Sequence, residues 1–335
     1  MPQPRYLQKG INVLRTIVST IAIGLTTIIV GPVQAQFGES TSESTVGPQL
    51  GDSLVQRYKV GMVITARQGP CGAVYATIPV PTDWPEQDVK IVEENISDNV
   101  QKVRYRTLDN GVRQMLVNVA RLDPAEKATV LVTFEVTRRS LLPPPDTGVF
   151  RIPEKIPRTD RKYLASSPLI ESRDSRIRDL AREVTASEPD AWAQIEALCN
   201  WVKDNVEHQN GPAKGAAKTV REGKGNHEDL ASVFIALCRA RKVPARTVWV
   251  PDYCYAEFYL EDQDGNGYWI PCELKEKSTF GTMPEKATIM QKGDNIQVPE
   301  KKEPQRFVPE YVKGKVGRGL GRPAVNFVRQ VLPGN

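Results

Sequence analysis

The chain has 335 residues, of which a quarter are charged, with 26 Pro, 24 Gly and an ordinary aromatic content. These values are typical of a globular protein of about two domains. The formal net charge is +5, and three of the positive charges lie within the first 35 residues, which contain no acidic residue. The rest of the chain is therefore close to neutral. This argues against a general nucleic-acid-binding protein, which depends on excess positive charge.

The N-terminus has the pattern of an export signal. Arg5, Lys9 and Arg15 precede the apolar run TIVSTIAIGLTTIIV, and Val33 and Ala35 are small residues at the positions read by signal peptidase. We expect residues 1–35 to be a signal peptide cleaved after Ala35. The mature protein is then periplasmic or extracellular and has no membrane attachment. An uncleaved anchor is the alternative, although the run falls short of the roughly 20 residues that span a bilayer.

Short alternating runs follow a Ser/Thr/Gly-rich linker at residues 36–51 and predict a β domain over residues 52–140. Turn residues separate these runs, and the proline-rich segment LLPPPDTG ends the domain. The spacing predicts a small antiparallel β-sandwich. The predicted strands are LVQRYKVGMVITA, AVYATIPV, VKIVEE, VRYRTL, VRQMLVNVA and ATVLVTFEV.

Two helices are predicted in the second domain, residues 150–310. The first begins after a Ser187 cap and carries Ile195, Leu198, Cys199 and Val202 on one apolar face. His208 follows this helix as a solvated or capping residue. The second begins after an Asn226 cap, with Asp229 at the third helical position and an apolar stripe of Leu230, Phe234, Leu237 and Cys238. Cys199 and Cys238 are predicted core residues.

Three strands are predicted after the second helix, in KVPARTVWVPD, YCYAEFYLE and YWIPCEL, with DQDGNG as a hairpin turn. A helical segment followed by an antiparallel sheet defines an α+β domain. Residues 311–335 form a basic, Gly-containing C-terminal tail, which we expect to be mobile and solvated. A polyanion or membrane-surface site is the alternative for this tail.

These blocks together resemble the transglutaminase-like superfamily, the papain-like α+β core shared by transglutaminases, microbial cysteine peptidases and peptide N-glycanases. The family pattern runs G-x-C-x-D, an apolar helix, R-A-x-G-[IV]-P-A-R, H-x-W-x-E and W-x-x-x-D. In this chain the blocks are GNHED at 225–229, RARKVPAR at 239–246, YCYAE at 253–257 and WIPCE at 269–273. The resemblance covers roughly residues 187–273 and rests on the order and spacing of the blocks.

The resemblance implies a catalytic Cys, His and Asp, and all three positions differ here. His227 stands at the Cys position, Tyr253 at the His position and Glu273 at the Asp position. The family chemistry needs a thiolate at a helix N-terminus and a histidine that takes its proton. An imidazole cannot form the thioester intermediate, and a phenol with a pKa near 10 is a poor proton shuttle. The positions are thus interpreted as a vestigial triad.

Neither the other cysteines nor a metal restores the chemistry. Cys254 and Cys272 are one residue away from the vestigial positions, so they should face the other side of their strands. Cys71 lies in the other domain. A metal on His227, Glu228, Asp229 and Glu273 is the remaining alternative, but the sequence contains no H-x-x-x-H or C-x-x-C pair. We expect no metal and no cofactor.

The leading functional hypothesis is an exported, catalytically inactive transglutaminase-like protein that binds a protein or peptide segment in its cleft. The identity of this partner is open, and its class rests on analogy with the family. The alternative is an active hydrolase, peptidase or acyltransferase with a non-standard site.

Two contacts follow from the expected register. His227, Tyr253 and Glu273 should form a hydrogen-bonded chain, in which the Tyr253 hydroxyl donates to Glu273 and accepts from His227. Cys254 and Cys272 should face each other across two paired strands, where they either form a disulfide or stay as two buried thiols. Five cysteines leave at least one unpaired within the monomer.

Overall fold

The structure is a computed structural model that describes residues 46–315 and 319–333. The expected signal peptide and most of the expected linker lie outside the described residues. Across the two described ranges, no helix is both long enough and apolar enough to cross a membrane.

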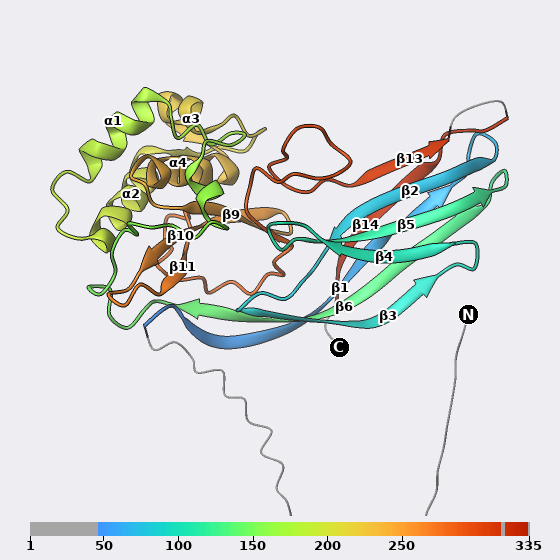
Figure 1. Ribbon diagram of the computed structural model, residues 1–335, viewed down its shortest axis with the longest axis horizontal. Helices are drawn as coiled ribbons and strands as arrows, with labels where there is room; N and C mark the ends of the chain where they lie inside the picture. The colour runs from blue at the N-terminus through green and yellow to red at the C-terminus, as the bar shows by residue number, and fades with distance from the viewer. Residues whose placement is uncertain (1–45, 316–318, 334–335) are drawn as a thin grey trace, which may run out of the picture. The chain divides into compact units, whose positions relative to one another are not determined.

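Two four-stranded antiparallel sheets form the β domain (Figure 1). One has the strand order β14-β1-β6-β3 and the other β13-β2-β5-β4. Apolar side chains of β1 and β6 share one buried cluster with those of β2 and β5, so the two sheets pack face to face as the predicted sandwich. The strands are β1 Gln49–Thr65, β2 Cys71–Val80, β3 Gln87–Ile96, β4 Lys102–Thr107, β5 Arg113–Leu122, β6 Lys127–Leu142, β13 Tyr311–Lys315 and β14 Ala324–Leu332.

All six predicted runs of the β domain are strands in the structure. The alternation that predicted them reflects burial. In β1, Val60, Met62 and Ile64 are fully buried, whereas Lys59 and Val63 are partly exposed. β1 begins at Gln49, within the expected linker. β6 ends at Leu142, directly before the three prolines, as predicted.

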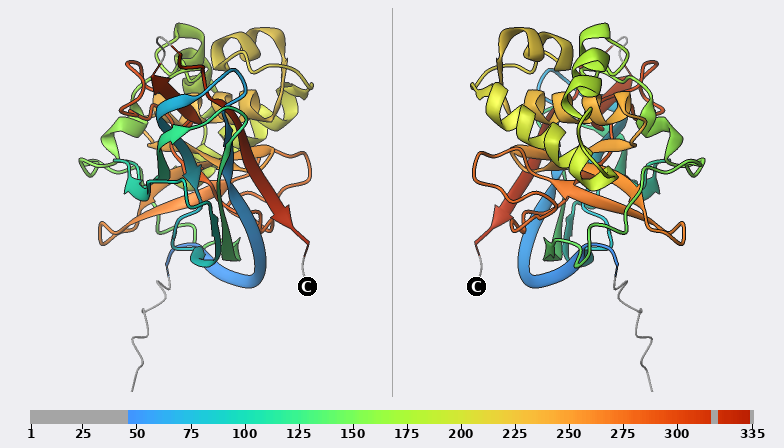
Figure 2. Two further views of the ribbon diagram at one scale, coloured as in Figure 1. Left: turned by 90° about the vertical axis from the view of Figure 1, so that its right-hand side faces the viewer. Right: turned by 90° about the vertical axis from the view of Figure 1, so that its left-hand side faces the viewer.

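The expectation of a mobile C-terminal tail is wrong. β13 pairs with β2, and β14 pairs with β1 from Arg57↔Leu332 to Thr65↔Ala324, so each strand completes one sheet of the sandwich. The reason is that Val312, Val325 and Phe327 pack against the sandwich core. Glycines and basic residues around these short apolar stretches hid their strand pattern in the sequence. The C-terminal strands return to the first domain (Figure 2).

The second region is a helical layer on a four-stranded antiparallel sheet, as predicted for an α+β domain. The sheet order is β11-β10-β9-β12, and β10 pairs with both β9 and β11. Helix α4 packs on β9 and β10 and is surrounded by α1, α2 and α3 (Figure 1). The elements are α1 Ser175–Val184, α2 Ala191–Asn205, β7 Glu207–His208, α3 Ala216–Glu222, β8 Lys224–Gly225, α4 His227–Ala240, β9 Ala245–Val250, β10 Tyr253–Glu261, β11 Gly267–Cys272, β12 Gln291–Lys292 and the 3-10 helix η1 Arg161–Leu164.

Helix α2 begins later than predicted. Asp190, not Ser187, is its N-cap, and the Asp190 carboxylate accepts a hydrogen bond from the amide of Ala193 at 2.8 Å. Pro189 explains the shift, because it disfavours helical backbone at the residue before it. The predicted apolar face is confirmed, since Ile195, Leu198 and Val202 are fully buried.

A buried network of charges joins the two regions. The Lys292 ammonium lies 2.6 Å from the carboxylate of Glu86, next to β3, and 2.6 Å from that of Glu257 on β10. Arg246 on β9 binds the other oxygen of Glu257 at 2.7 Å. The side chains of Glu86, Glu257 and Lys292 are at most 4% exposed. Because water does not reach these charged groups, each of them is stabilised by its ion-pair partners instead of by hydration.

Candidate functional site

His227 is the first residue of α4, as predicted, and the local sequence fixes it there. The Asn226 side chain accepts from the amide of Asp229 at 2.9 Å, and the Asp229 carboxylate accepts from the amide of Asn226 at 3.1 Å. This reciprocal pair is the predicted capping box. It holds the half-buried His227 at the positive end of the helix dipole.

Asp229 also anchors the segment before α3. Its other oxygen accepts from the amides of Lys214 at 2.7 Å and Gly215 at 3.0 Å. The glycine at position 225 is required by packing, since a Cβ there would lie 2.6 Å from the Cβ of Asp229. The Gly-x-x-x-Asp spacing thus holds α4, α3 and β8 together around the helix N-terminus.

Tyr253 and Glu273 form the predicted hydrogen bond. The Tyr253 hydroxyl donates to Oε1 of Glu273 at 3.1 Å. Lys275 binds the same carboxylate at 2.8 Å and lies 4.5 Å from the Tyr253 ring centre. Burial, with the charge and hydrogen bond of Glu273, raises the pKa of Tyr253 far above its ordinary value. The phenol therefore stays protonated and acts as a hydrogen-bond donor.

His227 meets Tyr253 through its ring and not through the predicted hydrogen bond. The two ring centres are 5.1 Å apart at 82°, an edge-to-face contact. The predicted hydrogen bond from His227 to the Tyr253 hydroxyl is therefore wrong. The three side chains are nevertheless brought together, because Tyr253 contacts both His227 and Glu273.

His208 is the partner that sequence reasoning missed. It is exposed, as expected, but its ring stacks on that of His227, with centres 4.0 Å apart and planes 27° apart. The contact results from a short parallel pairing of β7 with β8. This pairing places His208 opposite Gly225, two residues before His227. No periodicity or motif in the sequence signals a pairing of two such short strands.

A pocket of about 550 Å³ opens at these residues. Its polar wall comes from the N-terminus of α4, and Trp249, Met290 and Phe307 add apolar and aromatic surface. The C-terminal strand β14 contributes Arg329 and Val331, which sequence reasoning assigned to a tail. The lining includes Tyr58, His208, Asn210, Asn226, His227, Glu228, Asp252, Tyr253 and Cys254.

The acidic residues beside His227 have other partners. Glu228 forms an ion pair with Arg306, and burial raises the pKa of the Glu228 carboxyl. Asp229 is occupied by backbone amides. Among the residues that the structure describes, no three His, Cys, Asp or Glu side chains converge as a metal site would require.

All five cysteines are buried free thiols. The predicted Cys254–Cys272 pairing is wrong, because Cys272 is opposite Ala256 and Cys254 is opposite Trp249. The assumed register between β10 and β11 was two residues off, so the Tyr253–Glu273 contact is a diagonal one. Cys254 lines the pocket at 4% exposure, and burial raises the pKa of its thiol strongly. Cys254 is therefore held as a thiol rather than a reactive thiolate.

We expect a pH dependence from the stacked histidines. Burial, with the charges of His208 and Lys275, lowers the pKa of His227 from its ordinary value of 6.5. The unfolded chain then binds more protons below pH 6.5, so folding stability falls as the pH drops from 6.5 through the lowered pKa. In NMR titrations, which have only two histidines to assign, His227 should titrate below 6.5. His208→Ala should move it back toward 6.5. An unchanged His227 pKa in that variant would contradict a coupled pair.

A helix N-terminus set against the middle of an antiparallel sheet, with a pocket in front of it, is the arrangement expected of a transglutaminase-like core. Residues 178–274 match the model of the transglutaminase-like superfamily, so this part of the chain is a transglutaminase-like domain. No curated protein matches the chain.

Two solved structures are similar to this one. A putative cysteine protease from Cytophaga hutchinsonii matches with a TM-score of 0.52 and 16% identity, over 85% of this chain and 94% of that one. A putative protease from Parabacteroides distasonis matches with a TM-score of 0.25 and 11% identity, over 67% of this chain and 48% of that one. The first similarity extends the shared fold from the transglutaminase-like domain to the β domain.

Proposed function

We propose that this protein is an exported, catalytically inactive transglutaminase-like protein whose pocket binds a peptide segment. The observation that carries the proposal is His227 at the first turn of α4, facing the pocket. The resemblance assigns the nucleophilic thiol to this position, and all five cysteines of the chain are buried at other positions. One of them, Cys254, lies in the pocket wall, where burial raises the pKa of its thiol. Acyl transfer through a thioester has no attacking group in this arrangement.

The pocket chemistry supports a peptide ligand. Aromatic surface from Trp249 and Phe307 suits side chains of an extended segment, and exposed donors and acceptors from His208 and Asn210 suit its backbone. The pocket is formed by both regions of the chain, through β14 as well as α4. Export rests on the leader-like N-terminus, which brings the pocket to protein segments or cell-wall peptides outside the cytoplasm.

The inactive site predicts an absence of thiol-dependent turnover. With a glutamine-donor peptide and a primary amine, the purified protein should release no ammonia above the blank, and a peptidase panel should give no cleavage. His227→Ala should give the same result, because no chemical step is lost. Turnover that disappears after iodoacetamide treatment would overturn the proposal.

A second candidate is a hydrolase that uses the stacked imidazoles. His227 has a lowered pKa, so near neutral pH it is an unprotonated base at the edge of the pocket. In this candidate His227 takes a proton from an attacking water, while the Tyr253 hydroxyl keeps its hydrogen bond to Glu273. Such turnover would resist iodoacetamide and fall by about 10²-fold or more in His227→Ala. This result separates the two candidates.

Restoring the residue types of the family is expected to restore little activity. In His227→Cys with Tyr253→His, a thiol would stand at the helix N-terminus with an imidazole beside it. Lys275 would still bind the Glu273 carboxylate that must orient the new histidine. We expect weak thiol-dependent turnover at best in the transamidation assay. Turnover at the rate of an efficient enzyme, roughly 10 per second, would show that the site had kept its catalytic geometry.

A further inference from the structure

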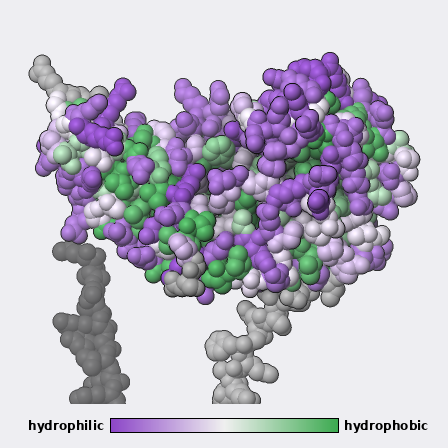
Figure 3. Space-filling view, turned by 180° about the vertical axis from the view of Figure 1, so that it is seen from behind, coloured by the Kyte–Doolittle hydropathy of each residue, from purple (hydrophilic) through white to green (hydrophobic). Residues whose placement is uncertain are grey.

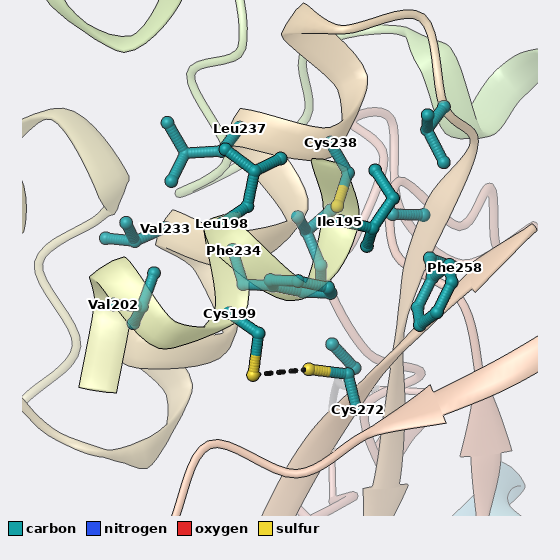
Figure 4. Packing of buried hydrophobic residues seen from close by; sticks show 14 of the residues in the cluster. Ile195, Leu198, Cys199, Val202, Val233, Phe234, Leu237, Cys238, Phe258 and Cys272 are labelled. Carbon is teal, nitrogen blue, oxygen red and sulfur yellow. Dashed lines mark hydrogen bonds between the residues drawn. The ribbon is translucent and has the colours of Figure 1, made fainter. Parts of the chain in front are cut away.

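Cys199 and Cys272 meet in the core beneath the helical layer (Figure 4). Cys199 lies on the buried face of α2, and Cys272 is the last residue of β11. Their sulfur atoms are 3.3 Å apart, and both residues are fully buried. The two positions are 73 residues apart in the chain, so the contact depends on the tertiary fold.

The other three thiols have different surroundings. Cys71 belongs to the sandwich core and Cys254 to the pocket wall. Cys238 on α4 shares the core of Cys199 and Cys272, yet the sulfur-to-sulfur contact in that core joins Cys199 to Cys272 (Figure 4). The Cys272 thiol donates to the Cys199 sulfur, and this hydrogen bond lowers the pKa of Cys199. The contact is thus between a thiol donor, Cys272, and a sulfur acceptor, Cys199.

We propose that Cys199 and Cys272 form a disulfide when the chain folds in the presence of a thiol–disulfide oxidant. A disulfide needs sulfurs about 2 Å apart, so the two atoms must approach by only about 1 Å. The bridge links α2 to β11, whose next residue is Glu273, the hydrogen-bond acceptor of Tyr253.

The reaction is balanced by two exchanges with an oxidant such as glutathione disulfide. The Cys199 thiolate attacks one glutathione sulfur, forms a mixed disulfide and releases one glutathione thiolate. The Cys272 thiolate then attacks the Cys199 sulfur and releases the second glutathione. One protein disulfide forms, the oxidant is reduced by two electrons, and the two protons go to the released glutathiones. Because both sulfurs are buried in the folded protein, the exchange takes place during folding, before the core closes.

The test is a thiol count on the full-length protein refolded in a glutathione redox buffer. Free thiols are blocked with N-ethylmaleimide in denaturant, and the protein is digested and analysed by mass spectrometry. Trypsin leaves Cys254 and Cys272 in one peptide, residues 247–275, so a second cleavage at Asp262 or Asp264 must separate them. We expect three blocked thiols, and a linked pair of peptides that contain Cys199 and Cys272.

Matched variants distinguish this pair from the neighbouring thiol. Cys238→Ala should keep the bridge and give two blocked thiols, whereas Cys272→Ala should give four blocked thiols and no bridge. Reduction should lower the melting temperature of the wild type by roughly 5–15 °C and leave that of Cys272→Ala unchanged. Five blocked thiols in the refolded wild type, glutathione adducts in place of the bridge, or a bridge that includes Cys238 or Cys254 would overturn the proposal.

Discussion

Replacing Lys292 with methionine is expected to lower the free energy of unfolding by about 3–5 kcal/mol. The ammonium of Lys292 lies between the carboxylates of Glu86 and Glu257, and both are nearly inaccessible to water. Methionine fills a similar volume but leaves Glu86 without its closest cation and Glu257 with Arg246 alone. Urea denaturation followed by circular dichroism measures the loss. Lys218→Met, which removes an exposed pair with Glu222, should change stability by about 0.5 kcal/mol at most.

The same network predicts a shift in acid stability. Burial by itself raises the pKa of Glu257, but Lys292 and Arg246 outweigh it and lower the pKa from 4.5 to about 2. Stabilisation by ionised Glu257 is therefore complete above pH 4.5 and is lost as the pH falls toward 2. In Lys292→Met the pKa of Glu257 in the folded protein rises, so less of this stabilisation is present and the midpoint of acid unfolding should move to higher pH. Equal acid-unfolding midpoints for the variant and the wild type would contradict the role of Lys292.

Replacing Asp229 with alanine is expected to cost about 3–5 kcal/mol of folding stability. The buried carboxylate accepts hydrogen bonds from three backbone amides, those of Lys214, Gly215 and Asn226. Alanine leaves these donors without an acceptor, and each buried unsatisfied donor costs about 1–3 kcal/mol. The variant should also lose the fixed start of α4, which thermal unfolding and the His227 NMR signal would show together.

Asp190→Ala is the matched control for Asp229→Ala. Asp190 is also an aspartate at a helix start, but it caps α2 through a single bond to the amide of Ala193. We expect a loss of about 1 kcal/mol for this variant and no change in the His227 signal. If the two variants were equally destabilised, Asp229 would be no more than an ordinary helix cap.

The sequence predicted those helices and strands that a single local pattern determines. Alternation such as that of Val60, Met62 and Ile64 identified β1, and the Asn226-to-Asp229 spacing identified the start of α4. The hairpin of β10 and β11 followed from its turn residues. In each case neighbouring residues in the chain supply the determining contacts, so the sequence contains the signal.

The features that the sequence did not predict all depend on contacts between segments that are far apart in the chain. His208 reaches His227 only through the pairing of β7 with β8, and β14 reaches β1 across most of the chain. The register of β10 with β11 sets Cys272 opposite Ala256, two residues from the expected partner. Register is decided by side-chain packing on α4 and the turn, which a strand pattern alone does not specify.

The position of Tyr253 and Glu273 was predicted correctly despite the wrong register. The resemblance placed both residues near His227, and side chains as long as Tyr and Glu span a diagonal between strands. A cysteine side chain is too short to span the same diagonal. The register error therefore made the predicted Cys254–Cys272 contact wrong.

The most direct test of a non-catalytic peptide-binding pocket is to measure peptide binding by the wild type and by the pocket variant Phe307→Ala, and to recover the bound peptides afterwards. A fluorescent library of unstructured ten-residue peptides is titrated by anisotropy, and the bound peptides are then recovered and weighed by mass spectrometry. We expect saturable binding that weakens by about 5–30-fold in Phe307→Ala and is unchanged in Phe327→Ala, which packs in the sandwich. All recovered peptides should have their original mass. Cleaved or modified peptides, or equal binding by both variants, would contradict a non-catalytic peptide-binding pocket.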